Sequence, residues 1–116
     1  MLKVNELFSG IGAQSAALKR LGIDFEVVAT ADTDKDALVS YAALHCKVPT
    51  EYEYPAATYM ADYLAERNIG YDFEKNKPYD WHRLISKKTG KASERLKKYY
   101  LSCIISKNRG DVRKIE

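Results

Sequence analysis

The sequence predicts an α/β fold with parallel strands. Two short apolar segments that can form buried strands, residues 2–7 and 25–31, are each followed by a segment whose apolar residues recur at helical spacing. A glycine-rich turn separates the first strand from its helix. Because strand, helix, strand and helix succeed one another within the first 45 residues, this order is typical of a βαβ unit with a right-handed crossover.

The boundaries of the first helix, the second strand and the second helix follow from local signals. Apolar residues at positions 13, 17 and 21 have helical spacing, and Gly22 is a stop signal. Residues 25–31 are β-branched and apolar, as expected of a buried strand. Asp34 can then cap a helix on which Leu38 and Tyr41 lie on adjoining faces.

Residues 47–108 are expected to form a helical insertion within the α/β unit, because they are too many for a plain crossover. Residues 48–55 resemble a loop, and a short helix is expected at residues 57–64. A longer amphipathic helix is indicated by apolar residues at i, i+3, i+4, i+7 and i+8, namely Leu96, Tyr99, Tyr100, Cys103 and Ile104. Residues 1–116 would form one small domain or a piece of a larger one.

Composition and charge narrow the class of protein. The net charge is +3, and the segment from Trp81 to Arg109 carries nine basic residues against one acid, Glu94. Such an excess attracts phosphate backbones or is simply a solvated helix face. No apolar run approaches the roughly 20 residues that span a bilayer, and no signal sequence begins the chain, so we expect a cytoplasmic protein without a membrane partner. Cys46 and Cys103 lack the spacing of a metal site.

The glycine-rich turn and a later aspartate predict a nucleoside site. Glycines let a ligand approach the main chain closely, and the start of the following helix offers unpaired N–H groups. Asp32 comes at the end of the second strand, twenty residues after Gly12. An acid at this spacing accepts hydrogen bonds from ribose hydroxyls in dinucleotide-type folds. We therefore assign Asp32 to ribose and Asp34 to the helix cap, although either could serve as the cap alone.

The residues around the turn limit the choice of nucleoside. A nicotinamide cofactor usually requires a third glycine where this chain has Ser15, which weakens that interpretation. Nucleoside triphosphates require Gly-Lys-Ser/Thr, which Ala13-Gln14 excludes. A ligand with a ribose and little phosphate remains, and S-adenosylmethionine fits this description.

Three sequence blocks resemble the first three motifs of DNA (cytosine-5) methyltransferases, especially phage and bacterial members. These blocks are Phe8-Ser9-Gly10-Ile11-Gly12-Ala13, then Asp32-Thr33-Asp34-Lys35 leading to Tyr41, and Gly110-Asp111-Val112. The resemblance is strong over residues 1–45, short at 107–116 and loose between them. It implies a Rossmann-like half-domain that binds S-adenosylmethionine, with methyl transfer to cytosine C5 of DNA in the full-length enzyme.

The resemblance also implies roles for individual residues. Phe8 would lie beneath the adenosine, and the backbone of Ser9, Gly10, Ile11, Gly12 and Ala13 would hold the methionine portion. Asp32 would bind ribose in place of the more usual glutamate, and Thr33 would replace a larger apolar residue that packs on adenine. Asp111 would accept from the adenine amino group, with the Val112 N–H beside it. Without the resemblance, a turn aspartate is the simpler interpretation of Asp111.

The family's nucleophile is a cysteine in a Pro-Cys dipeptide, and no such dipeptide occurs here, because Cys46 follows His45 and Cys103 follows Ser102. We therefore assign no catalytic residue and expect this chain alone to be inactive. Glu6, His45 and His82 are candidates by chemistry only. The unpaired edge of the first strand predicts a homodimer or another shielding arrangement. The alternatives are a non-catalytic module that binds nucleic acid or a partner subunit, and a nicotinamide oxidoreductase fragment.

Overall fold

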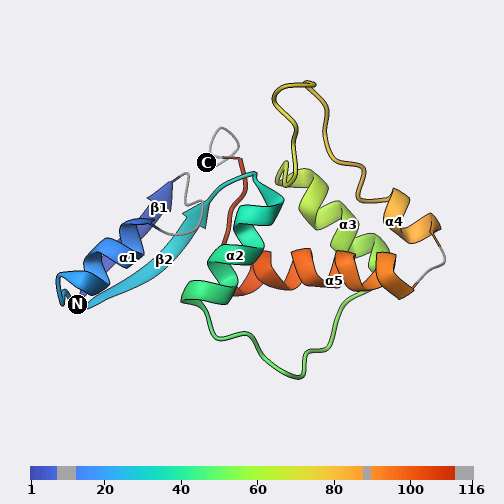
Figure 1. Cartoon of the computed structure of the whole chain (residues 1–116). Coiled ribbons are helices and arrows are strands. Elements are labelled where there is room, and N and C mark those ends of the chain that lie inside the picture. The colour runs from blue at the N-terminus through green and yellow to red at the C-terminus, as the bar shows by residue number, and fades with distance from the viewer. Residues whose placement is uncertain (8–12, 88–89, 112–116) are drawn as a thin grey trace.

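The computed structural model describes residues 1–7, 13–87 and 90–111 (Figure 1). Strand β1 (Leu2–Leu7) and strand β2 (Phe25–Ala31) pair in parallel. Helix α1 (Ala13–Arg20) connects them. The register runs from Leu2 opposite Phe25 to Leu7 opposite Ala31, with one irregularity between Val4 and Asn5. The two strands expected from the sequence are thus confirmed with their parallel pairing.

A third segment lies along the other edge of β2. Thr30 and Asn108 form an isolated parallel bridge. The Thr30 N–H donates to the Lys107 carbonyl at 3.2 Å, and the Arg109 N–H donates to the Thr30 carbonyl at 2.9 Å. The N–H and C=O of one strand residue point to the same side, so this segment and β1 flank β2 on opposite edges. Residues 107–109 therefore extend the parallel arrangement by a single bridge.

The helices after β2 form the second part of the molecule. Helix α2 (Lys35–His45) is followed by α3 (Ala57–Glu66), the one-turn α4 (Arg83–Ser86) and α5 (Gly90–Ile105). Helix α5 packs against α2, α3 and α4, and Figure 1 shows it passing beside all three. The helices expected near residues 57–64 and 96–104 are confirmed. That residues 47–108 constitute an insertion remains a prediction.

A buried hydrophobic cluster holds these helices together. Its members come from α2 to α5 and from the loop between α3 and α4: Leu38, Met60, Ala61, Leu64, Ile69, Trp81, Leu84, Ala92, Leu96, Tyr99, Tyr100 and Cys103. Trp81 is fully buried, and its indole N–H donates to the Ile69 carbonyl at 2.8 Å. Its ring also meets Tyr99 edge-on, with 5.3 Å between centroids. Because its polar N–H is satisfied, this large ring can be buried without the cost of an unpaired donor.

Gly110 allows the chain after residue 109 to pass directly against the end of α3. Its φ is +78°, a backbone conformation that side chains rarely adopt, and a Cβ there would overlap the Arg67 carbonyl oxygen. Gly22 also has a positive φ, +69°, but nothing lies within 4 Å of the position of its missing Cβ. A side chain at Gly22 would therefore meet backbone strain alone, whereas a side chain at Gly110 would meet both strain and steric overlap.

We predict that Gly110→Ala destabilises the chain much more than Gly22→Ala. The change at Gly22 should cost about 1 kcal/mol, which is the strain of a positive φ alone. At Gly110 the overlap with backbone adds to this strain, and the loss should exceed about 3 kcal/mol. Urea unfolding of both variants measures the difference. Equal losses would show that the Gly110 segment does not pack against Arg67 as described.

Candidate functional site

The ends of the parallel strands define one rim of the sheet, where the described site residues lie. Leu7, the last residue of β1, pairs with Ala31, the last residue of β2. Asp32 follows directly. The segment that bridges Thr30 runs in the same direction as β2, and it leads into Asp111. Leu7, Asp32 and Asp111 therefore lie at the same end of the sheet, where open α/β sheets bind ligands.

The side chain of Asn108 connects two parts of this rim. Its Oδ1 accepts a hydrogen bond from the Asp32 N–H at 3.3 Å and another from the Gly110 N–H at 2.6 Å. Asn108 is only 3% exposed. Asp32 and the residues next to Asp111 are thus tied to the same buried amide, although they are far apart in the sequence.

The turn after α3 contacts the same rim. The Gly70 N–H donates to the Thr33 carbonyl at 2.6 Å, and the Asp111 N–H donates to the Arg67 carbonyl at 2.9 Å. Asn68 donates from its Nδ2 to Asp111 Oδ2 at 3.1 Å. Asp111 is 3% exposed, and this amide contact is one of its interactions. Residues 67–70 therefore hold Thr33 and Asp111 in place from one side.

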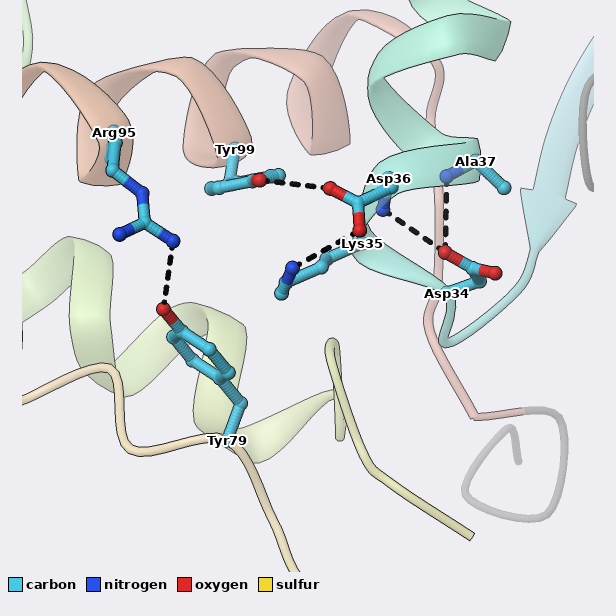
Figure 2. A network of polar contacts seen from close by, with 7 residues as sticks. All are labelled: Asp34, Lys35, Asp36, Ala37, Tyr79, Arg95 and Tyr99. Atoms are coloured by element: carbon cyan, nitrogen blue, oxygen red, sulfur yellow. Dashed lines mark hydrogen bonds and ion pairs between the residues drawn. The ribbon is translucent and has the colours of Figure 1, made fainter. Parts of the chain in front are cut away.

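Asp34 caps helix α2, as the sequence predicts. Its Oδ1 accepts from the N–H groups of Asp36 and Ala37, each at 3.0 Å (Figure 2). The Asp34 N–H itself donates to Asp32 Oδ1 at 3.0 Å. The cap therefore engages the first turn of α2, and the backbone of Asp34 orients the carboxylate of Asp32. Of the two aspartates, Asp34 alone makes these cap contacts in the described structure.

A polar network next to the rim joins α2 to α5 (Figure 2). Lys35 pairs with Asp36 at 3.1 Å, and the Tyr99 hydroxyl donates to Asp36 Oδ1 at 2.9 Å. Hydrogen bonds from Lys35 and Tyr99 lower the pKa of Asp36. Burial and the bond to Asp36 raise the pKa of Tyr99. Burial tends to lower the pKa of Lys35, but its contacts with Asp36 and two tyrosines raise it overall. The network thus favours the charged carboxylate and ammonium and the neutral phenol.

Several predicted site residues fall outside the described part of the chain: Phe8, Ser9, Gly10, Ile11, Gly12 and Val112. Ala13 begins helix α1. Asp32, Thr33 and Asp111 come together at the rim, and their contacts to ligand remain a prediction.

Sequence reasoning did not identify Asn108, Asn68 or Arg67 as part of the rim. Asn68 lies after the helix expected at residues 57–64, and Asn108 lies within residues 107–116 but outside the block Gly110-Asp111-Val112. No local pattern signals these contacts, because Asn108 is 76 residues from Asp32 and Asn68 is 43 residues from Asp111.

The structure describes the backbone of Glu6 and the side chains of His45 and His82, the three candidates for catalysis by chemistry alone, as well as the thiol of Cys103. Cys103 is fully buried, and burial raises its pKa to about 12, so it is not a ready nucleophile. His82 contacts Asp62 at 2.6 Å on the surface, and His45 contacts Lys19 at 3.0 Å. In β1, the backbone of Glu6 pairs with Thr30. Across the described ranges, no group of three or more acidic, histidine or cysteine side chains could hold a metal ion.

A pocket of about 400 Å³ lies away from the rim, near Phe25 at the start of β2. Its lining includes Lys19, His45, Lys47 and Lys107. Helices α1, α2 and α5 end beside it, so these basic groups face the negative ends of three helix dipoles. Cations are favoured near the C-terminal end of a helix, so the basic lining does not by itself indicate a ligand. None of the helices described is long and apolar enough to cross a membrane.

Comparison with known proteins identifies the relatives of this chain. Residues 2–53 match the C-5 cytosine-specific DNA methylase family. The type II methyltransferase M2.ScrFI of Lactococcus lactis subsp. cremoris is 31% identical over 119 aligned residues, covering 100% of this chain and 31% of that protein. The chain is related by sequence to the cytosine-5 DNA methyltransferases.

Two further relatives extend this finding. The orphan methyltransferase M.SssI of Spiroplasma monobiae is 32% identical over 116 residues, which cover 96% of this chain and 28% of the relative. The orphan methyltransferase M.SPBetaI of Bacillus phage SPbeta is 50% identical over 44 residues, or 38% of this chain and 10% of the relative. Nearly the whole chain aligns with M2.ScrFI and with M.SssI, and it spans about a third of the length of each. The predicted resemblance to phage and bacterial methyltransferases is confirmed.

We predict that Asp34→Ala lowers the free energy of unfolding by about 1 kcal/mol, because two N–H groups of α2 lose their acceptor. Asp24→Ala is the matched control, since Asp24 is exposed, and it should change stability by less than about 0.5 kcal/mol. Thermal or urea unfolding measures both. A loss no larger than that of the control would contradict the capping role.

Proposed function

We propose that this chain is the cofactor-binding part of an S-adenosylmethionine-dependent DNA (cytosine-5) methyltransferase, with a Rossmann-like arrangement of its strands. The observation that carries the proposal is the family match over residues 2–53, which contain β1, the glycine-rich turn, β2 and Asp32. The parallel pairing supports it. Leu7, which precedes the glycine-rich turn, lies opposite Ala31, which precedes Asp32, so both strands end at the same rim.

Each half of the cofactor has candidate partners in this chain. The carboxylate of Asp32 would accept from the ribose hydroxyls, since a carboxylate accepts several hydrogen bonds at once. Its orientation is set by the bond from the Asp34 N–H. Asp111 would accept from the adenine amino group. The helix start at Ala13 and the preceding glycine-rich turn would face the methionine portion with backbone N–H groups.

The bound cofactor would supply an electrophilic methyl group for C5 of cytosine in DNA. This chain's own contribution would be to bind and orient the cofactor. We expect it to supply no nucleophile for cytosine C6, because neither of its cysteines follows a proline. Cytosine-5 transfer by the whole protein is therefore proposed from the relatives, as are DNA as substrate and a cytoplasmic location. The comparisons do not favour a non-catalytic module over a methyltransferase.

The outer edge of β1 is proposed as an association surface. Within the described ranges β1 pairs only with β2, so its second edge has backbone groups without a strand partner. Apolar side chains stand beside it: Met1 is 78% exposed and Leu2 is 51% exposed. A second copy of the chain, or another strand of the longer protein, would cover them.

Calorimetric titration with S-adenosylhomocysteine tests the cofactor proposal. The wild-type chain should bind, and Asp32→Ala should bind at least about tenfold more weakly, because hydrogen bonds to a charged group are worth about 1.5–3 kcal/mol. Asp34→Ala is the matched control and should keep the wild-type affinity, since its backbone N–H remains. Binding of NAD with none of S-adenosylhomocysteine would instead favour an oxidoreductase, and equal affinity of Asp32→Ala would remove the ribose role.

Sedimentation analysis tests the association surface. The wild-type chain should self-associate as its concentration rises, and Leu2→Lys should be monomeric because a charge on an edge strand opposes pairing. Leu44→Lys provides the control, since Leu44 is also exposed but lies on α2. A wild-type chain that stays monomeric throughout, with amide exchange showing β1 open to solvent, would count against the proposal.

A further inference from the structure

Asn108 is buried at the point where the segment after α5 meets β2. Its backbone forms the single parallel bridge with Thr30, and its N–H donates to the Cys103 carbonyl at 3.0 Å. Its carbonyl in turn accepts from the Cys103 thiol, with 3.3 Å between sulfur and oxygen. The backbone of Asn108 is thus held on two sides, by the strand and by the last turn of α5. Its side chain is consequently presented to the rim from a well-anchored position.

The hydrogen bonds of this side chain determine which way its amide faces. Oδ1 lies within reach of two N–H groups, those of Asp32 and Gly110, at 3.3 and 2.6 Å. Since an N–H donor requires an oxygen acceptor, the amide cannot be turned the other way. Both bonds go to backbone, and they come from the two segments that carry Asp32 and Asp111.

The nitrogen of the same amide, Nδ2, differs from the oxygen in its hydrogen bonding. Nδ2 of Asn108 is the single buried side-chain nitrogen or oxygen without a hydrogen-bond partner in the part of the chain described here. An unsatisfied buried donor costs about 1–3 kcal/mol. An apolar side chain of similar size would avoid this cost, so packing alone does not account for an amide at this position. The two bonds accepted by Oδ1 are what the amide contributes.

We propose that Asn108 is a positioning residue of the nucleoside site: its side-chain oxygen holds the segments of Asp32 and Asp111 at the separation that an adenine nucleoside needs. This inference rests on the proposed cofactor-binding function. Ribose and adenine are joined rigidly enough that both carboxylates must be placed together to bind one ligand. Asn108 touches neither carboxylate in the described contacts and acts through the backbone of the segments that carry them.

Amide hydrogen exchange measured by NMR tests the bonds themselves, without any ligand. In the wild-type chain the amides of Asp32 and Gly110 should be protected. Asn108→Leu has a similar volume and no acceptor, so both amides should exchange at least about tenfold faster. Asn108→Asp keeps an acceptor oxygen and should keep most of the protection. Unprotected amides at both positions in the wild-type chain would overturn the proposal even if no variant folds.

Calorimetric titration tests the consequence for binding. Asn108→Leu should weaken S-adenosylhomocysteine and adenosine by the same factor, at least about tenfold, because only the nucleoside half contacts the two aspartates. Asn108→Asp should recover most of the loss. A core variant, Leu101→Ala, controls for lost stability, since Leu101 is buried but belongs neither to the rim nor to the hydrophobic cluster among α2 to α5. It should reduce the fraction of competent protein and leave the dissociation constant unchanged.

The possible results separate the two proposals. If the wild-type chain binds neither S-adenosylhomocysteine nor adenosine, the cofactor-binding function fails and this inference fails with it. If the wild-type chain binds and Asn108→Leu binds equally well, only the positioning role is overturned. The same holds if Asn108→Asp protects both amides yet binds as weakly as Asn108→Leu, because the hydrogen bonds would then not govern affinity.

Discussion

The parallel register of β1 and β2 is the constraint on which the candidate site depends. With Leu7 opposite Ala31, the turn that follows β1 and the aspartate that follows β2 start from one end of the sheet. An antiparallel pairing of the same two segments would send them to opposite ends. The connection through α1 accounts for the parallel choice, because parallel strands need a crossover of about a dozen residues or more, and a helix supplies it.

The helices that follow pack against one another, and they also complete the rim. Trp81 pins the loop after α3 through the Ile69 carbonyl and packs on Tyr99 of α5. This packing places residues 67–70 against Thr33 and Asp111, and it places the end of α5 where Asn108 can reach β2. The rim is therefore assembled from both parts of the molecule, and its geometry depends on the hydrophobic cluster among α2 to α5.

Much of the fold and part of the site could be predicted from local patterns. The two strands, the cap at Asp34 and the helix around Leu96 each depend on residues within a few positions of one another, so sequence spacing reveals them. Asn68 and Asn108 could not be predicted in this way. Their contacts to Asp111 and Asp32 join residues 43 and 76 positions apart, and asparagine has no local signature for such a partner.

The sequence by itself determined the order of the two strands and of helices α1, α2, α3 and α5, but not the one-turn α4. It also determined the glycine-rich turn with Asp32 twenty residues after Gly12, and the relation to cytosine-5 DNA methyltransferases. These are properties of short segments, whose spacing and composition carry the information. Only the tertiary structure decided that Asn108 Oδ1 accepts hydrogen bonds from the N–H groups of Asp32 and Gly110. It also decided that Asp111 is hydrogen-bonded to Arg67 and Asn68 after α3. Such contacts are settled by how the helices pack, because burial brings together backbone groups that no spacing rule connects.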